Sequence, residues 1–339
     1  MEKNNPFLSF RHKQKAAFAL KKIWNPTWFQ GNRQKKNYFE GWYFKSVSED
    51  GGHSMAFIPG ISVNGADSHS FVQAINGKTG QTWYFRFPLE AFNYSGKGFS
   101  VAIGPNFFSE KGFELELHNE TGFFKGKLNF GETARFPVSL RRPGIMGWYR
   151  YVPFMECYHG VVSLDHPVDG SIESAEGIFT FNNGRGYIEK DWGTSMPEAW
   201  IWMQTNHFEQ TGNSFMLSIA KIPWIGSSFT GFLGFFLHQG HLYPFATYTG
   251  AKVVKVDQSG DGLTIMIKSR KFSLEITAEK GEKGSLKAPV SGNMERVIHE
   301  SIDASLQIKL FDARGKIIFA GAGTNAGLEL AGETSILSP

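Results

Sequence analysis

The chain has 339 residues, of which 41% are hydrophobic and 19% are charged, a composition that excludes a disordered chain and allows a large buried core. The formal net charge is +4, and the sequence has no RNA-binding, zinc-finger or helix-turn-helix motif, so nucleic acid is excluded as an expected partner. Cys157 is the only cysteine, which excludes an intrachain disulfide and favours a reducing, cytoplasmic compartment.

Residues 1–36 form a basic N-terminal segment that precedes the predicted domains. Lysine and arginine interrupt the apolar residues of 1–22, which argues against a signal peptide. Residues 16–24 follow a short basic amphipathic pattern, which predicts a surface helix packed on the domain. Contact of this segment with the inner face of a membrane is the alternative.

From residue 38 onward, short segments of alternating apolar and polar residues are separated by turn sequences such as Asn64-Gly65 and Asn76-Gly77. This spacing predicts an all-β fold with few short helices, in which antiparallel strands form a sandwich or barrel. In the first block, strands are expected at 38–47, 53–61, 69–75, 81–87, 99–103, 113–118 and 123–130.

A second block repeats this pattern as far as residue 328. Strands are expected there at 158–165, 172–181, 186–192, 199–208, 214–220, 231–238, 241–248, 251–257, 262–269, 271–278, 304–311 and 316–328. Residues 280–303 are expected to be irregular, with a short helix at 293–300. Two barrel-like halves, 37–170 and 171–339, are predicted to meet around residues 165–200, where ligand sites often form.

No Asp, Glu, Lys or Arg occurs from residue 222 to residue 251. Prolines and glycines interrupt this apolar stretch, so two buried strands with turns are expected rather than a membrane-spanning helix. A loop around Trp224, Ile225 and Phe229 that dips into a membrane is the alternative.

The segment 187–193 (YIEKDWG) places two carboxylates two residues apart in a predicted strand. Alternate side chains of a strand share a face, so Tyr187, Glu189 and Asp191 are expected together. Two partly desolvated carboxylates cannot both ionise freely, which raises the pKa of one of them and suits it to general-acid catalysis. A solvated strand in which Lys190 pairs with the acids is the alternative.

Glu40 lies among aromatic residues in the segment 38–45 (YFEGWYFK). An unpaired buried carboxylate is costly, so an Arg, Lys or Trp N–H partner is expected. Glu40 and the neighbouring Trp42 are candidates for a binding site, and a structural hydrogen bond or salt bridge is the alternative.

Trp200, Trp202, Gln204 and Asn206 share one face of a predicted strand. Large aromatics beside amides predict an apolar pocket with a few oriented polar groups. A plain core whose amides bond to the backbone is the alternative. His159 is expected either to transfer protons or to cap a strand end. No metal-binding spacing or nucleotide-binding loop occurs, so neither a metal nor a cofactor is predicted.

The segments 38–45, 187–193, 200–208 and 286–289 occur in the same order as in the tocopherol cyclase family, which the chain resembles over residues 37–330. The resemblance implies two packed lipocalin-like (calycin) β-barrels and a relation to the carotenoid hydratase superfamily. It also implies the chemistry: a prenyl double bond is protonated, and a phenol oxygen, or water in the hydratases, traps the cation.

The resemblance assigns roles to single residues. Tyr187 and Glu189 match the Tyr and the acid of the hydratase relatives, and Glu189 also matches the Glu of the cyclase motif. Asp191 departs from that motif, which has Asn. The long insert of plant members is not apparent, and Tyr158-His159 matches the family only loosely.

The leading hypothesis is therefore acid-catalysed cyclisation or hydration of a prenylated quinol or another isoprenoid lipid. Glu189 would donate the proton, and Tyr187 and Asp191 would tune it. The substrate would be bound by Glu40, Trp42, His159, Trp192, Trp200, Trp202, Gln204 and Asn206. The rival hypothesis is a non-catalytic carrier of a hydrophobic ligand. A third is a membrane-associated module that uses residues 1–24 and 222–236.

Overall fold

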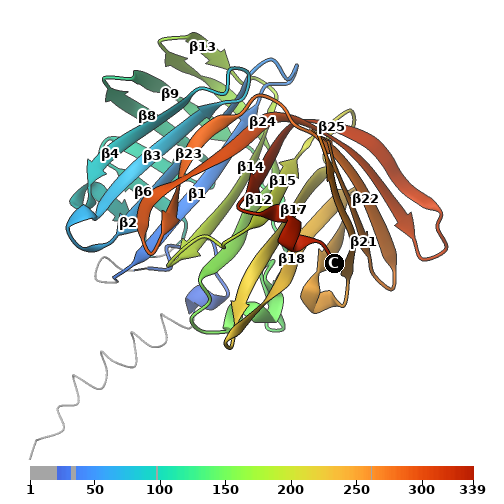
Figure 1. Cartoon of the computed structure of the whole chain (residues 1–339). Coiled ribbons are helices and arrows are strands. Elements are labelled where there is room, and N and C mark those ends of the chain that lie inside the picture. The colour runs from blue at the N-terminus through green and yellow to red at the C-terminus, as the bar shows by residue number, and fades with distance from the viewer. Residues whose placement is uncertain (1–20, 32–35, 97, 261) are drawn as a thin grey trace, which may run out of the picture.

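A computed structural model describes residues 21–31, 36–96, 98–260 and 262–339. Two large antiparallel sheets dominate it, as Figure 1 shows. The sequence-based prediction of an all-β fold with few short helices is therefore confirmed. The short helices are all 3-10 turns, except for a helical turn at residues 21–23: η1 (Gly65–Asp67), η2 (Leu89–Ala91), η3 (Gly147–Tyr151), η4 (Thr247–Thr249) and η5 (Thr334–Leu337).

The first sheet has the strand order β4-β3-β2-β1-β14-β12-β9-β8-β7-β6-β5, with β13 paired to β12. Its core draws buried side chains from both edges, such as Phe85 on β4 and Phe92 on β5, so the sheet curls into a barrel. The strands are β1 (Tyr38–Val47), β2 (Ser54–Val63), β3 (His69–Asn76), β4 (Thr82–Pro88), β5 (Phe92–Tyr94), β6 (Ser100–Ile103), β7 (Asn106–Ser109), β8 (Gly112–Asn119), β9 (Gly122–Phe130), β12 (Cys157–Ser174), β13 (Gly177–Thr180) and β14 (Gly184–Gly193).

The second sheet has the order β19-β18-β17-β15-β25-β24-β22-β21-β20, with β16 paired to β25 and β23 to β24. A second core includes Phe245 from one edge strand and contacts Val253 from the other, so this sheet curls as well. The strands are β15 (Trp200–Thr205), β16 (His207–Phe208), β17 (Ser214–Trp224), β18 (Ser227–His238), β19 (His241–Ala246), β20 (Lys252–Ser259), β21 (Gly262–Lys268), β22 (Phe272–Glu279), β23 (Gly284–Val290), β24 (Asn293–Asp312) and β25 (Ile317–Ala331). A small separate ribbon pairs β10 (Val138–Ser139) with β11 (Arg142–Pro143).

A third hydrophobic cluster joins the outer faces of the two barrels. It contains Tyr43 and Tyr187 from the first sheet and Trp200 and Trp202 from the second. Polar contacts cross the same interface, including Ser54 Oγ to the carbonyl of Ile302 at 3.0 Å. The chain thus has two barrel interiors and a buried seam between them.

The chain passes from the first sheet to the second between β14 and β15, at residues 194–199. The division predicted at residue 170 lies inside β12, which continues in the first sheet to Ser174. The domain boundaries therefore stay a prediction. The two strands expected within 222–251 are confirmed by β18 and β19, which form a hairpin.

The single strand expected at 172–181 is instead a hairpin, in which the end of β12 pairs with β13. The expectation for residues 280–303 is also wrong. Residues 280–303 are not irregular, and 293–300 is not helical, because β23 and β24 form a hairpin there. Pro289 and Gly292 suggest a loop in the sequence, but they lie at the bend of this hairpin. Bulges between Ser301 and Leu306 further break the two-residue period of β24. Of the predicted amphipathic helix at 16–24, residues 16–20 lie outside the described residues.

A buried ion pair joins β1 and β14 inside the first barrel. Lys190 pairs with Glu40, and both side chains are fully buried. The ammonium group also lies 4.5 Å from the ring centre of Trp42 and 4.8 Å from that of Trp192. Burial lowers the pKa of Lys190 to about 8, and the attraction of Glu40 opposes this shift.

We predict that Lys190→Met lowers the free energy of unfolding by about 3–5 kcal/mol, because the substitution leaves the Glu40 carboxylate buried without its cation. Urea unfolding followed by tryptophan fluorescence measures this. The matched control is Lys255→Met, which removes an exposed pair with Asp257 at 3.0 Å and should change stability little. Equal midpoints for the two variants would contradict the prediction.

Candidate functional site

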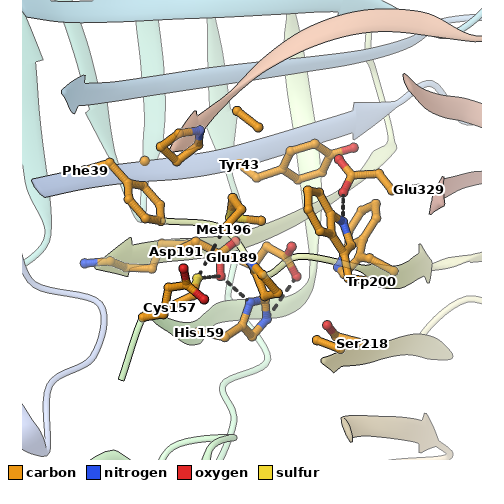
Figure 2. A pocket seen from close by; sticks show the side chains of 18 of the residues that line it. Phe39, Tyr43, Cys157, His159, Glu189, Asp191, Met196, Trp200, Ser218 and Glu329 are labelled. Atoms are coloured by element: carbon orange, nitrogen blue, oxygen red, sulfur yellow. Dashed lines mark hydrogen bonds and ion pairs between the residues drawn. The ribbon is translucent and has the colours of Figure 1, made fainter. Parts of the chain in front are cut away.

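A cavity of about 210 Å³ lies in the seam between the barrels, outside both barrel interiors. We call it the inter-barrel cavity, and Figure 2 shows its walls. Most of its lining is apolar or aromatic, which suits a hydrophobic ligand. Polar groups enter from both barrels: His159, Glu189 and Asp191 from the first, and Glu300 and Glu329 from the second.

Strand alternation positions the acids of β14. Tyr187, Glu189 and Asp191 share the face toward the seam, as predicted, and Lys190 points into the first barrel. The alternative in which Lys190 pairs with these acids on a solvated strand does not hold. β12 places His159 directly opposite Asp191 in the strand register.

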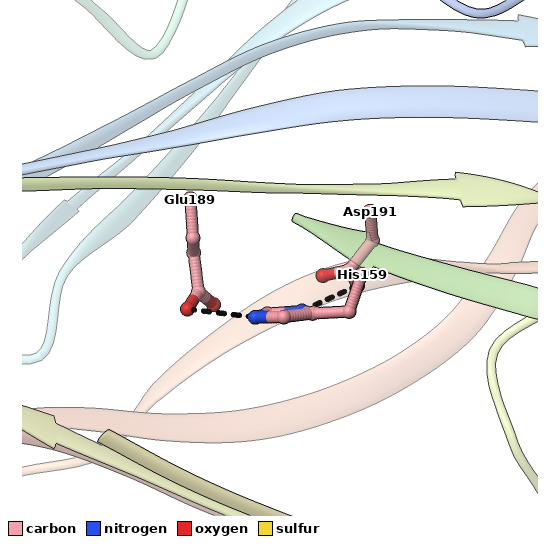
Figure 3. Close-up of side chains that lie close together, drawn as sticks. All are labelled: His159, Glu189 and Asp191. Carbon is pink, nitrogen blue, oxygen red and sulfur yellow. Dashed lines mark hydrogen bonds and ion pairs between the residues drawn. The ribbon is translucent and has the colours of Figure 1, made fainter. Parts of the chain in front are cut away.

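The ring of His159 lies between the two carboxylates, as Figure 3 shows. Its Nδ1 lies 2.9 Å from Asp191 Oδ1, and its Nε2 lies 3.3 Å from Glu189 Oε2. The hydroxyl of Tyr187 donates to the same Glu189 oxygen at 2.5 Å. We call these four residues the histidine cluster. The geometry agrees with proton transfer at His159 rather than with strand capping.

The electrostatics of the cluster place a proton on His159. Burial alone would lower the pKa of His159, but the carboxylates of Glu189 and Asp191 outweigh it and raise the pKa to about 10. The imidazole is therefore a cation at neutral pH. Burial and the neighbouring Glu189 raise the pKa of Tyr187 well above its ordinary value, so its hydroxyl remains a donor.

His159, Glu189 and Asp191 also offer ligand atoms within 4.8 Å of one another, a set that could hold a metal ion. Each carboxylate contacts a different nitrogen of the ring, however. A metal-bound imidazole must lose its proton and direct one nitrogen at the ion, so the carboxylate at the other nitrogen would have to move to that side. The arrangement favours a proton-bearing histidine.

A second group of acids faces the cavity from the other barrel, and sequence analysis missed it. Glu300 on β24 and Glu329 on β25 are partners in the strand register; Glu300 is buried and Glu329 is half-buried. Tyr43 donates a hydrogen bond to Glu300, and Trp200 Nε1 donates to Glu329 Oε2 at 2.7 Å. We call Glu300 and Glu329 the glutamate pair.

The glutamate pair retains a proton near neutral pH. Burial raises the pKa of Glu300 well above its ordinary value, and the charge of Glu329 adds to this. Burial, with the charges of Glu189 and Asp191, raises the pKa of Glu329 to about 7. Two carboxylates in one buried site cannot both ionise, so the pair holds a neutral carboxylic acid.

Tyr43 connects the two groups of acids. It is the register partner of Glu189 across β1 and β14, and it donates a hydrogen bond to Glu300 of the other barrel. Lys45, on the same face of β1, is buried, and burial lowers its pKa to about 7 against the attraction of Glu300 and Glu189. Its ammonium group donates to Gln204 Oε1 at 3.0 Å.

The predicted substrate-binding residues divide into three groups. His159, Trp200 and Trp202 line the inter-barrel cavity. Within the described part of the chain, the buried Nε1 of Trp202 has no hydrogen-bond partner, so it can donate to a ligand oxygen.

Two other groups lie away from the cavity. Glu40, Trp42 and Trp192 face the interior of the first barrel, where Glu40 forms the buried ion pair with Lys190. The contacts of Glu40 therefore agree with the alternative prediction, a structural salt bridge, rather than with a binding site. Gln204 and Asn206 join the barrels: Asn206 donates to Asp165 at 2.9 Å and to the carbonyl of Gly186 at 2.8 Å. Within the described part of the chain, none of these five residues lines the cavity. Their role as substrate contacts stays a prediction.

The raised pKa of His159 predicts a pH dependence of stability. A histidine whose pKa rises from 6.5 to about 10 on folding stabilises the fold fully below pH 6.5 and loses this contribution as the pH rises to 10. We therefore expect the difference in unfolding free energy between the unmodified protein and His159→Gln to shrink across this range. Urea titrations at a series of pH values test this, and a difference that stays constant or grows would contradict it.

Comparisons with known proteins agree with the geometry. A tocopherol cyclase-like family model matches residues 128–332, more than half of the chain. The chloroplastic tocopherol cyclase of Zea mays is 24% identical over 87% of this chain and 75% of its own length. A probable chloroplastic tocopherol cyclase of Oryza sativa subsp. japonica matches with the same identity and coverage.

Solved structures share the fold at low identity. CghA has a TM-score of 0.56 at 8% identity and covers 87% of this chain and 89% of its own. A candidate AttH of Nitrosomonas europaea has a TM-score of 0.50 at 13% identity, with 87% and 92% covered. These likenesses concern the fold alone. The family match, which covers most of the residues that line the inter-barrel cavity, assigns the molecule more closely: the chain belongs to the tocopherol cyclase-like family.

Proposed function

We propose that the protein is an enzyme that protonates a double bond of a prenylated phenol or quinol and thereby closes a ring or adds water. Family membership and the two curated relatives support a cyclase-type reaction, and hydration is the variant in which water captures the same cation. The observation that carries the proposal is the placement of a neutral carboxylic acid and a second, hydrogen-bonded carboxylate in one largely apolar cavity.

Ring closure needs one proton delivered and one removed. The acid forms a C–H bond at one carbon of the double bond and leaves a tertiary cation at the other. The phenol oxygen attacks this cation, and its hydroxyl proton passes to a base. The product is an isomer of the substrate, so no net proton is consumed; the base then releases its proton to solvent and the acid takes one up before the next cycle. In hydration, water takes the place of the phenol.

We assign the delivered proton to the glutamate pair and the removed proton to Glu189. The pair holds a neutral carboxyl at neutral pH, which is what a general acid requires. In the histidine cluster the proton rests on His159; Glu189 accepts a hydrogen bond from Tyr187 and forms an ion pair with His159 at 3.3 Å. This assignment differs from the sequence-based hypothesis, in which Glu189 is the donor.

The rest of the cavity suits a short-lived cation. The aromatic faces of Trp200 and Trp202 can stabilise positive charge, and the apolar walls limit early capture by water. The free N–H of Trp202 can orient a substrate oxygen. A non-catalytic carrier would use the same walls, but it would not need two carboxylates buried at a cost beside them.

We predict that Glu329→Gln and Glu189→Gln each lower kcat by about 10²–10⁴-fold, because each removes one of the two proton transfers. The assay incubates the protein with a prenylated hydroquinone in D2O and detects products by mass spectrometry. Ring closure gives an isomer with one deuterium on carbon, and hydration gives a product heavier by one water. Glu116→Gln, on the exposed face of β8 and outside the cavity lining, is the control. Binding without turnover by the unmodified protein would favour the carrier.

The pH profile separates the two candidate donors. If the glutamate pair donates, kcat of the unmodified protein falls as the pH rises through about 7, because the neutral carboxyl is lost. Glu189→Gln should keep this fall in kcat and move it to lower pH, because the charge of Glu189 raises the pKa of Glu329. Retention of the fall in the double variant Glu300→Gln/Glu329→Gln would return the donor role to Glu189.

A further inference from the structure

Large apolar side chains are exposed around η3 and the β17–β18 turn. Phe154 is 98% exposed, Ile225 90% and Leu140 76%. Trp148 and Tyr151 are also exposed. Soluble surfaces rarely gather so many large apolar groups without an interaction to bury them. We call these five residues the apolar rim.

Contacts around η3 hold the apolar rim together. The hydroxyl of Tyr151 donates to the carbonyl of Leu140 at 2.5 Å, and Trp24 donates to the Tyr151 hydroxyl at 3.2 Å. Trp148 stacks on Tyr149 with ring centres 4.1 Å apart, and Tyr149 meets Trp224 at 6.3 Å. Figure 1 shows the β17–β18 turn at the same lower end of the molecule as the chain near residue 21.

The two most exposed members adopt an unfavourable backbone conformation. Phe154 has a φ of 61° and Ile225 a φ of 41°, both in the left-handed region. This region is costly for a β-branched or bulky residue, and Asn or Gly would fit better. The chain therefore keeps apolar side chains at two exposed turns where neither burial nor backbone preference favours them.

Two exposed basic residues lie close in sequence to the rim or to its contacts. Lys21 and Arg141 are exposed, and each is close in sequence to a rim contact residue, Trp24 or Leu140. Residues 1–36 contain nine Lys or Arg and one acid, Glu2, whereas the rest of the chain has more acids than bases. The basic residues of the chain are thus concentrated in the segment 1–36, in which the described residue Trp24 contacts Tyr151 of the rim.

The inter-barrel cavity reaches this end of the molecule. Its lining includes Tyr149 of η3, Met155 next to Phe154, and Pro223 and Phe229 on the two arms of the β17–β18 hairpin. Pro223 is exposed, and the other three are half-buried. The rim therefore borders a wall of the cavity.

We infer that the apolar rim is a docking surface for an anionic lipid bilayer. The exposed aromatic and aliphatic side chains would enter the interface between headgroups and acyl chains, and the basic residues would lie against anionic headgroups. The charge asymmetry of the chain favours this partner over a second copy, which would bring the same positive charges together. Docking would also place the cavity wall at a surface from which a hydrophobic ligand can enter.

The test is flotation of the full chain with vesicles. We expect binding to vesicles that contain phosphatidylserine or phosphatidylglycerol, weaker binding to phosphatidylcholine vesicles, and release as salt rises. The variant Phe154→Asn/Ile225→Asn should bind at least about tenfold more weakly, because it removes two insertable side chains. Asn also fits both left-handed turns, so the variant should remain folded.

Ile178→Asn is the matched control, since Ile178 is 65% exposed on β13. It should bind like the unmodified protein. Absence of binding to anionic vesicles, or equal binding by the rim variant, would overturn the inference. So would a concentration-dependent dimer, seen by analytical ultracentrifugation, that the rim variant abolishes without vesicles. Flotation requires no turnover, so failure of the proposed reaction would leave this result interpretable.

Discussion

The two-residue period of β14 is the constraint on which the rest of the structure depends. Its neighbours β1 and β12 fix the strand between them, so alternate side chains must point to opposite faces. Lys190 and Trp192 complete the interior of the first barrel, and Glu189 and Asp191 face the seam. A shift of register by one residue would exchange the two sets and place both acids in a hydrophobic core.

The seam gathers ionisable groups that burial would otherwise disfavour. Each is stabilised by a partner from another strand: His159 by two carboxylates, Glu329 by the indole N–H of Trp200, and Glu300 by Tyr43. The group that carries the proton differs between the two barrels. On the first barrel the proton resides on a nitrogen, and on the second it stays on a carboxyl oxygen. Proton transfer in both directions thus becomes available in one cavity.

Residues of the first barrel's side of the site were largely predictable, because local alternation determines them. Tyr187, Glu189 and Asp191 share a face as the period requires, and Trp200 and Trp202 do so on β15. What sequence could not decide is which face meets a cavity. Glu40 and Trp42 follow the same period but point to a barrel interior, because the seam covers only the other face of β1.

Glu300 and Glu329 could not be found from local pattern, since their pairing joins strands separated by a turn and several bulges. The bulges also hid the part of β24 that precedes residue 304, and with it the location of Glu300. A single acid within the apolar run Ala326–Ala331 was the available signal for Glu329. Glu329 becomes recognisable as a site residue only beside Glu300, its partner on another strand. The alternation of side chains within one strand does not reveal such a partner.

The cavity lies outside both barrel interiors, so the residues that stabilise the fold differ from the residues that shape the binding site. Each barrel holds its own hydrophobic core, and the reactive groups occupy the joint between them. Side chains such as Ser218, Ala220 and Leu233 can therefore change the shape of the cavity without opening a hole in either core. Such a scaffold can acquire new substrates by exchange of a few wall residues, while selection for folding acts mainly elsewhere in the chain.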